Sequence, residues 1–256
     1  MTDAVDPGWV RRMAEDLARL GVRRGGVLLV HASFKALSPV PGGAETVMAG
    51  LLEAITARGT LLMPALSYTT VTPEQPVFEQ AQTPSCVGYL SEFFRTRAGT
   101  QRSLHPTHSV CAVGPQAGAL LNAHRNSKTP VGEHSPFRKL RDMDGQILML
   151  GCGLKPNTSM HGVEELQPPP YLYGPVVVYT VKPGDGMAFE MRLRTHGFQG
   201  FAQRYDRIEA LLAPAGHLRK GTVAGAESFL IEAPAMWRAG ELALRRDPLH
   251  FVEKIG

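Results

Sequence analysis

The stretch VLLVHASFKALSPVPGGAETVMAGLLEAITARGTLLMPAL, residues 27–66, decides the fold. It opens with the apolar run Val27 to Val30, which predicts a buried strand. Ala44 to Ala57 is expected to be a helix, and Gly59 precedes a second apolar strand from Thr60 to Leu66. A strand, a helix and a strand within about 40 residues match a βαβ unit. The stretch therefore predicts a parallel, largely buried sheet.

The flanking segments add helices and further strands. Apolar residues at helical spacing predict a helix from Trp9 to Leu20. Ser67 to Pro84 has no clear periodicity and is interpreted as a long loop. Beyond it we expect helices at Val87 to Arg97, Pro115 to His124 and Pro136 to Leu140, an extended segment from Arg102 to Val113, and a strand from Gln146 to Gly151.

The character of the sequence changes after Gln167-Pro168-Pro169-Pro170. Val176 to Val181 and Phe189 to Leu193 are strand-like, and Lys182 to Gly186 between them is typical of a turn, which predicts a hairpin added to the sheet. Helices are expected at Phe201 to Leu212 and from about Ala224 to Arg246. The whole predicts one α/β domain, residues 1–256, with a central mixed sheet, helices on both faces and an added β-hairpin region in the C-terminal third.

Composition excludes several classes of protein. With 43% hydrophobic and 20% charged residues, the 256-residue chain has the composition of a soluble globular protein. Its three cysteines, Cys86, Cys111 and Cys152, form no disulfide framework and indicate a reducing compartment. Met1 to Leu20 has no signal core and no window approaches the roughly 18 apolar residues of a membrane span, so we expect a cytoplasmic protein with no membrane partner. The net charge is +4, but the lysines and arginines are scattered along the sequence, which argues against nucleic acid as a partner.

The chemistry is expected in Asn157-Thr158-Ser159-Met160-His161-Gly162-Val163-Glu164, directly after the strand that ends at Gly151. α/β enzymes keep reactive groups at this end of their strands. If a helix starts here, with Thr158 or Ser159 as N-cap, His161 faces Glu164 across one turn. His161 is then placed as a general base near neutral pH. The spacing fits equally a histidine that only packs at a helix start.

Four segments, taken in order, resemble the aminoglycoside 3-N-acetyltransferase family, antibiotic-resistance N-acetyltransferases outside the GNAT fold. They are Leu29–Phe34 with Gly42-Gly43-Ala44 and Gly59–Pro64; Thr83-Pro84 with Phe93-Phe94-Arg95 and Arg102–Pro106; Gly132–Pro136 with Gly145–Gly151; and Asn157–His161 with Glu164. The last third resembles the family more loosely, around Tyr205-Asp206 and Gly221–Ala226.

The resemblance implies direct transfer of an acetyl group from acetyl-coenzyme A to an amine. His161 matches the family's catalytic histidine and Glu164 its glutamate three residues on. Thr158, Ser159 or nearby backbone N–H groups are candidates for stabilising the oxyanion. Asp206 lies near another family carboxylate and is a second candidate for orienting the amine or His161.

The resemblance also suggests binding residues. His31, Ser33, Arg102, Ser103, Ser135 and Phe137 are expected along the coenzyme A channel. His31 and Ser33 fit equally a strand-end cap, and Ser135 is also a helix cap before Pro136. Glu133 and Glu165 are expected to make the acceptor pocket acidic, together with Glu164 and Asp206. Lys155 stands where the family commonly has an aspartate, six residues before His161, and a cation there opposes a polycationic acceptor.

Other functions stay open beside this one. The acceptor is alternatively a different amine in a biosynthetic pathway, or the chain is a catalytically silent homologue that binds coenzyme A. A cysteine paired with His161 would instead give an acyl-enzyme. His105, His108 and Cys111, spaced by three, fall on opposite faces of an extended segment, so no metal is expected. The oligomeric state is left undetermined.

Overall fold

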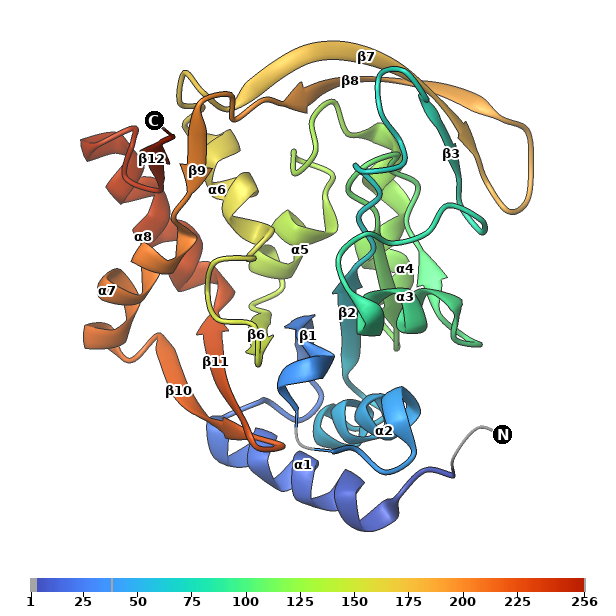
Figure 1. The fold of residues 1–256 in the computed structure, drawn as a ribbon, viewed down its shortest axis with the longest axis vertical. Coiled ribbons are helices and arrows are strands. Elements are labelled where there is room, and N and C mark those ends of the chain that lie inside the picture. The colour runs from blue at the N-terminus through green and yellow to red at the C-terminus, as the bar shows by residue number, and fades with distance from the viewer. Residues whose placement is uncertain (1–3, 38, 256) are drawn as a thin grey trace.

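The computed structural model describes residues 4–37 and 39–255 and is built around a seven-stranded mixed sheet (Figure 1). The strand order is β10-β11-β6-β1-β2-β5-β4. β1 pairs in parallel with β2 and β6, and the other neighbours pair antiparallel. The strands are β1 Val27–Ala32, β2 Thr60–Pro64, β4 Gln101–Arg102, β5 Val110–Val113, β6 Gln146–Leu150, β10 Leu218–Val223 and β11 Ala226–Glu232.

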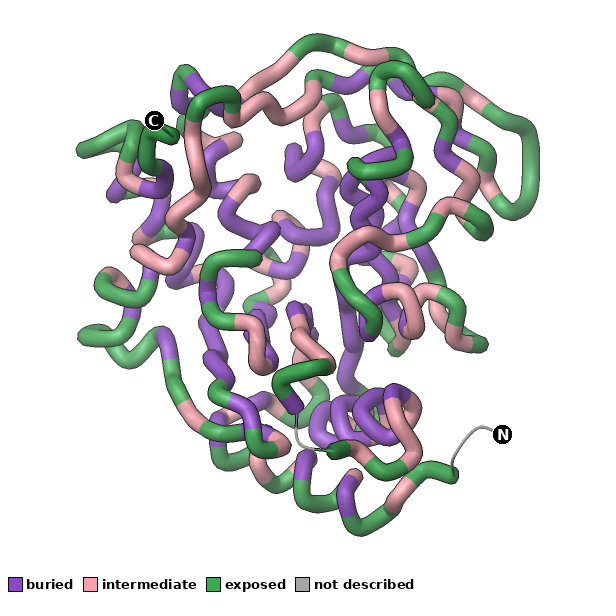
Figure 2. Tube along the Cα trace, in the orientation of Figure 1, coloured by how far each residue is buried: buried purple, intermediate pink, exposed green. Residues whose placement is uncertain are grey.

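Helices cover both faces of this sheet, as the sequence predicts. In β1, Leu28 and Val30 point into one core and Leu29 into the other, which is the alternation of a strand buried on both sides. One face carries α1 Pro7–Leu20, α2 Gly43–Ile55 and α3 Tyr89–Thr96. The other carries α4 Ala117–Leu121, α5 Pro136–Asp142, α6 Ser159–Leu166, α7 Ile208–Leu212 and α8 Ala233–Arg246. Buried residues run through α2, α6 and the central strands (Figure 2).

The helix ends follow from local chemistry. Asp6 caps α1 by accepting a hydrogen bond from the Trp9 N–H, and Gly21, at φ 104°, ends the helix in the left-handed region. Ser135 caps α5 in the same way, accepting from Phe137 N at 3.1 Å. The described residues also contain four short 3-10 turns: η1 Phe34–Ala36, η2 Asn122–Asn126, η3 Tyr205–Arg207 and η4 Ala213–Ala215.

The β-hairpin of the C-terminal third forms a sheet of its own, contrary to the expectation that it extends the central sheet. β7 Tyr173–Lys182 and β8 Phe189–His196 pair with β3 Val77–Glu79 in the order β3-β7-β8. β3 lies inside the segment interpreted as a loop without secondary structure. The hairpin arches over the carboxyl ends of β1 and β2 (Figure 1). Its own small core is formed by Val71, Phe78, Tyr179, Val181, Met191 and Leu193.

Three further expectations are wrong in detail. Arg102 to Val113 is a hairpin, because β4 and β5 pair antiparallel around a turn at Pro106–His108. Phe201 to Leu212 is mixed, since β9 Phe201–Gln203 pairs with β12 Val252–Lys254 before η3 and α7 begin. The helical region expected from Ala224 starts with β11, and α8 begins only at Ala233. Among the described residues no helix combines the length and hydrophobicity needed to cross a membrane.

Candidate active site

His161 projects from the first turn of α6, where the chain leaves the carboxyl end of β6. Thr158 occupies the cap position, but its side chain makes no capping bond; the Ser159 N–H donates instead to Oδ1 of Asn157 at 3.2 Å. Asn157 is fully buried and its amide also contacts Sδ of Met236 in α8 at 3.2 Å. Asn157 therefore ties the start of α6 to α8 and fixes where the imidazole points.

The imidazole of His161 is linked to Glu164 through a tyrosine. Nδ1 of His161 lies 2.8 Å from the hydroxyl of Tyr205, which donates to Oε2 of Glu164 at 2.7 Å. Oε1 of Glu164 accepts from the Tyr171 hydroxyl at 2.8 Å. The direct separation between His161 Nδ1 and Glu164 Oε2 is 3.5 Å. Burial, followed by the charge of Glu164, raises the pKa of Tyr205 well above its usual value, so this hydroxyl keeps its proton.

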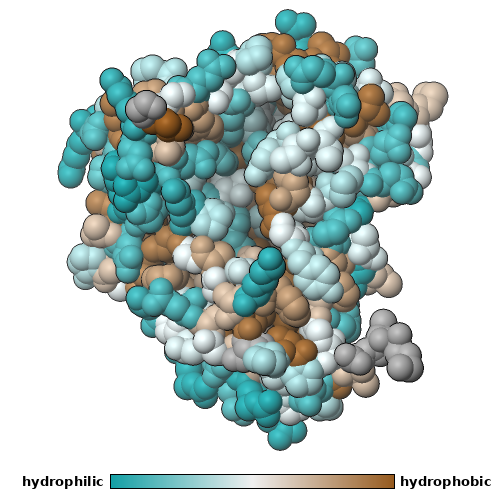
Figure 3. Space-filling view, viewed as in Figure 1, coloured by the Kyte–Doolittle hydropathy of each residue, from teal (hydrophilic) through white to brown (hydrophobic). Residues whose placement is uncertain are grey.

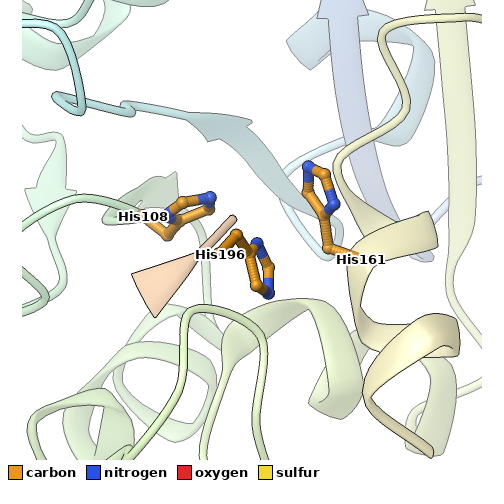
Figure 4. Close-up of side chains that lie close together, drawn as sticks. All are labelled: His108, His161 and His196. Carbon is orange, nitrogen blue, oxygen red and sulfur yellow. The ribbon is translucent and has the colours of Figure 1, made fainter. Parts of the chain in front are cut away.

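Two more histidines face His161 (Figure 4). His196, the last residue of β8, has its ring centroid 4.8 Å from that of His161, and His108, in the β4–β5 turn, lies 6.0 Å away. His108 and His196 are 5.5 Å apart. Burial lowers the pKa of both far below the usual histidine value, and the neighbouring histidines lower it further. Both rings are therefore neutral at pH 7.

Glu165 lies behind His196 and does not face the cavity. Its Oε1 accepts from His196 Nε2 and from the Val131 N–H, both at 2.8 Å, and Oε2 accepts from the Thr129 hydroxyl. Burial raises the pKa of this carboxyl, while those hydrogen bonds oppose the shift. Glu165 therefore orients the imidazole of His196 and, contrary to the prediction from the sequence, does not make the cavity acidic.

A cavity of about 640 Å³ opens in front of His161, where the loops after β2 and β6 meet the β7–β8 hairpin. Its walls carry rings and neutral polar groups, including Tyr68, Thr158, His196, Phe198 and Tyr205. Lys155 is the charged side chain in this lining; no aspartate or glutamate of residues 4–37 and 39–255 is part of it. On the face shown in Figure 3 hydrophilic residues prevail, with apolar residues showing between them near the middle.

Of the residues predicted for catalysis, the structure brings together three. His161 and Glu164 lie 3.5 Å apart on α6 and Thr158 occupies the cap position of the same helix, with Thr158 and His161 lining the cavity. Asp206 lies apart from the imidazole: it is paired with Arg204 at 2.9 Å, and that hydrogen bond is the main cause of its lowered pKa. Its neighbour Tyr205 makes the contact with His161.

The residues predicted for coenzyme A fall into two groups. His31 and Ser33 lie close together at the carboxyl end of β1, beside β6. Burial, and then the proximity of His161, lowers the pKa of His31 to about 3. The side chains of the other four interact within the fold. Arg102 donates to the Ser109 hydroxyl and to the carbonyls of Ala65, Gln80 and Thr83. Ser103 contacts His124, Ser135 caps α5, and Phe137 is in the core.

The remaining predicted residues differ in exposure. Glu133 is exposed and outside the cavity lining, whereas exposed Lys155 is part of it. Cys152, the nearest cysteine in sequence to His161, donates to the His31 carbonyl, and burial raises the pKa of its thiol to about 12. Burial raises the pKa of Cys111 to about 12 as well. Neither thiol is activated as a nucleophile.

Sequence reasoning assigned no role to Tyr171, Tyr205, His108 or His196. The pair Tyr205-Asp206 stood in a segment resembling the family, and the tyrosine of that pair is the signal that could have been used. Glu190, Arg192 and Arg194 are exposed and alternate along β8, and His196 is the next residue in that series. The alternation of the strand therefore suggested an exposed His196 and gave no sign that its ring lies beside His161. His108 was assigned to an extended segment, and the observed turn directs it toward the other two histidines.

A known protein family matches most of the chain. The family model described as aminoglycoside 3-N-acetyltransferase matches residues 29–245. The chain is 30% identical over 249 residues to aminoglycoside N(3)-acetyltransferase III of Serratia marcescens, covering 88% of this chain and 92% of that protein.

Solved structures show the same architecture. A histidine variant of aminoglycoside acetyltransferase AAC(3)-IVa, in complex with a gentamicin, superposes with a TM-score of 0.80 at 29% identity, covering 94% of this chain and 90% of that one. AAC-IIIb in binary complex with coenzyme A gives a TM-score of 0.80 at 27% identity over 93% and 96%.

Proposed function

The chain belongs to the aminoglycoside 3-N-acetyltransferase family, and on that premise we propose that it transfers the acetyl group of acetyl-coenzyme A directly to an amine of an aminoglycoside or related amino-sugar antibiotic. The observation that carries the proposal is the hydrogen-bond chain from His161 through the Tyr205 hydroxyl to the Glu164 carboxylate, with His161 in the cavity lining. Family relatives of known structure were captured with a gentamicin and with coenzyme A.

His161 acts as the general base. Because Tyr205 donates its proton to Glu164, its hydroxyl oxygen accepts from Nδ1–H of His161, which leaves the lone pair on Nε2. The amine nitrogen bonds to the acetyl carbon, the proton passes to Nε2, and the carbon–sulfur bond then breaks. The departing thiolate takes up that proton. Glu164 stabilises the imidazolium formed between the two transfers.

The remaining predicted residues support these steps. The Thr158 hydroxyl and the first N–H groups of α6 lie beside His161 and are the candidates that donate to the oxyanion. His31 and Ser33, at the end of the neighbouring strand, approach the thioester from the side of β1. We assign Arg102, Ser103, Ser135 and Phe137 to shaping the walls of the coenzyme A channel, since the polar side-chain atoms of the first three bond within the fold and Phe137 is buried in the core. Asp206, neutralised by Arg204, contributes indirectly by fixing η3, which carries Tyr205.

The test is turnover with acetyl-coenzyme A and a panel of amines, measured as free thiol released and as acetylated product. His161→Ala is expected to lower kcat by roughly 10²–10⁴-fold while leaving coenzyme A bound. His217→Ala, an exposed histidine outside the site, serves as the matched control. A His161→Ala enzyme with the wild-type rate would eliminate His161 as the base.

A different amine is the second candidate acceptor, and the cavity lining favours it. Lys155 is part of that lining, while Glu164 and Glu165 are bonded to Tyr171, Tyr205 and His196. A polycationic aminoglycoside would meet a like charge and no free carboxylate of the described residues. An acceptor with one or two amino groups fits this lining better.

Replacing Lys155 discriminates between a polycationic aminoglycoside and an acceptor with one or two amino groups. Lys155→Asp is expected to lower KM for polycationic aminoglycosides by roughly 3–30-fold, because the charge at the cavity mouth reverses. KM for a single-amine sugar should move far less, and added salt should reduce the difference. Lys155→Met, which removes the charge alone, should fall between wild type and Lys155→Asp. An unchanged KM for every polycation would place Lys155 away from the bound acceptor.

A further inference from the structure

His108, His161 and His196 form a compact group that the acetyl-transfer chemistry uses only in part. One ring nitrogen of each lies within 4.8 Å of a ring nitrogen of the other two. They come from three separate segments, the β4–β5 turn, α6 and the end of β8, and their side chains lie close together (Figure 4). All three line the same cavity.

The second nitrogen of every ring is already engaged. His108 Nδ1 bonds to the Thr107 hydroxyl at 2.9 Å, His161 Nδ1 to the Tyr205 hydroxyl at 2.8 Å, and His196 Nε2 to Glu165 at 2.8 Å. Within the described part of the chain, the ring nitrogens outside these bonds are Nε2 of His108, Nε2 of His161 and Nδ1 of His196. The last is buried and has no hydrogen-bond partner among residues 4–37 and 39–255.

We propose that His108, His161 and His196 form a three-histidine site for a late first-row divalent cation, with Zn²⁺ as its best fit. Three neutral imidazoles without a carboxylate or carbonyl oxygen suit zinc, copper or nickel and disfavour magnesium, calcium and manganese. Zinc takes imidazole nitrogens at about 2.0–2.1 Å and commonly combines three protein ligands with an open fourth position. The three rings must move closer together to bind the ion, and the fourth position would then face the cavity that all three line.

Glu165 gives the site the outer support that metal-binding histidines usually have. Its carboxylate accepts from His196 Nε2 and is itself held by the Val131 N–H and the Thr129 hydroxyl. A carboxylate behind a histidine fixes the tautomer, turns the free nitrogen toward the ion and makes it a stronger donor. For His108 and His161 the hydroxyls of Thr107 and Tyr205 fix the orientation in the same manner.

Metal binding has a consequence for catalysis, and this step rests on the proposed function. The ion would bind the lone pair on Nε2 of His161, which in the proposed function takes the proton from the acceptor amine. The metal-bound enzyme is therefore an inhibited form, in which the ion and the amine compete for one place. Removal of the ion by a chelator restores the base.

Binding is tested on the full-length, metal-free protein without any turnover. Titration with Co²⁺ should produce the intense visible absorption of a four-coordinate cobalt site, and Zn²⁺ should displace it stoichiometrically. His108→Ala and His196→Ala should each weaken Zn²⁺ binding by roughly 100-fold or more, because two ligands remain. His217→Ala should bind as the wild type does. No cobalt band, or equal affinity in all three variants, would overturn the site.

A gentler variant guards against loss of folding. Glu165→Gln keeps all three rings and is expected to weaken Zn²⁺ binding by roughly 10–100-fold, the usual effect of removing an outer carboxylate. A circular dichroism spectrum like that of the wild type shows whether the variant is folded. Wild-type affinity in the folded Glu165→Gln protein would count against the orientation argued for His196.

Inhibition is tested separately, by mass spectrometry of the acetylated product, because zinc also binds the thiol released from coenzyme A. Product formation should fall as Zn²⁺ fills the site, more acceptor should offset the loss, and a chelator should reverse it. Full activity with a saturated site would overturn the inhibitory role. A protein that binds cobalt but acetylates no amine even in its metal-free form would refute the proposed function and leave the metal site standing.

Discussion

At the scale of single residues, Tyr205 determines which nitrogen of His161 is available. Its hydroxyl lies 2.8 Å from Nδ1 and 2.7 Å from the Glu164 carboxylate. A carboxylate only accepts, so the tyrosine proton points to Glu164 and Nδ1 carries the proton of the neutral ring. In the proposed mechanism Tyr205 is a positioning residue, since it would act on the amine through His161.

Tyr205→Phe separates positioning from binding. Losing a hydrogen bond to a charged group removes about 1.5–3 kcal/mol, which corresponds to roughly 10–100-fold in kcat. KM for the amine should change little, because the phenyl ring still fills the same place. Tyr171→Phe removes the other tyrosine from Glu164 without touching His161, so its loss in kcat should be smaller. Equal losses in the two variants, or a change confined to KM, would contradict this role for Tyr205.

His161 and Glu164 could be found from sequence because they are neighbours on one helical turn, a relation that spacing encodes. Tyr205 is 44 positions from His161 and His196 is 31 from Glu165. Such contacts depend on how β8 and η3 fold back over α6. No local pattern in the sequence carries that information.

At the scale of elements, the close contact of α6 with α8 holds the site in place. A Cβ added at Gly162 would lie 2.2 Å from Cη2 of Trp237 and 2.7 Å from Cγ1 of Val131. Gly162 directly follows His161, so the glycine lets the turn that carries His161 pack against the indole ring of Trp237. A larger residue would push the turn away.

Gly162→Ala is expected to destabilise the protein although alanine favours helices. Overpacking costs about 1–3 kcal/mol, against a gain of about 1 kcal/mol in helix propensity. The urea midpoint should fall, and kcat should fall with it because His161 moves. Gly118→Ala in α4 is the matched control: its nearest heavy atom is Nδ2 of Asn122 at 3.6 Å. That variant should gain stability, and a gain for Gly162→Ala as well would disprove the packing argument.

Helices and strands could be predicted from the sequence where their hydrophobic residues follow a single helical or strand periodicity. α1 has a strong polar and apolar face, a capping aspartate and a terminal glycine, and its predicted range was nearly correct. β11 was missed because it lies between β10 and β6, so Ser228 to Ile231 are all buried and the alternation of a strand is lost. The β7–β8 hairpin was found, but its separate sheet depends on β3, about 100 residues earlier, which periodicity could not indicate.

At the scale of the whole molecule, five histidines of the described residues have pKa values that burial lowers: His31, His105, His108, His124 and His196. Their neutral forms are favoured in the native state, whereas in the unfolded chain a histidine titrates near 6.5. Below that pH the unfolded state binds more protons. The free energy of unfolding therefore falls as the pH decreases from about 6.5 toward the lowered native values, and it is unaffected well above 6.5.

His124, which is outside the lining of the cavity in front of His161, allows this loss of stability to be measured. It is fully buried, its Nδ1 contacts the Ser103 hydroxyl at 2.8 Å and its ring stacks on His105 with centroids 4.7 Å apart. Burial is the main cause of its lowered pKa; His105, Lys139 and His134 add to it, and a backbone hydrogen bond to Pro130 opposes it.

His124→Asn tests the sign directly, through urea unfolding at pH 7, 6 and 5. In this pH window each such histidine makes the free energy of unfolding fall by up to about 1.4 kcal/mol per pH unit. The variant should start less stable at pH 7, because packing and the contact with Ser103 are disturbed, yet lose stability less steeply on acidification. His217→Asn, an exposed histidine, should keep the wild-type slope. If His124→Asn lost stability as steeply as the wild type, the proton taken up on unfolding would not be that of His124, and the acid sensitivity would have to come from the histidines around the cavity.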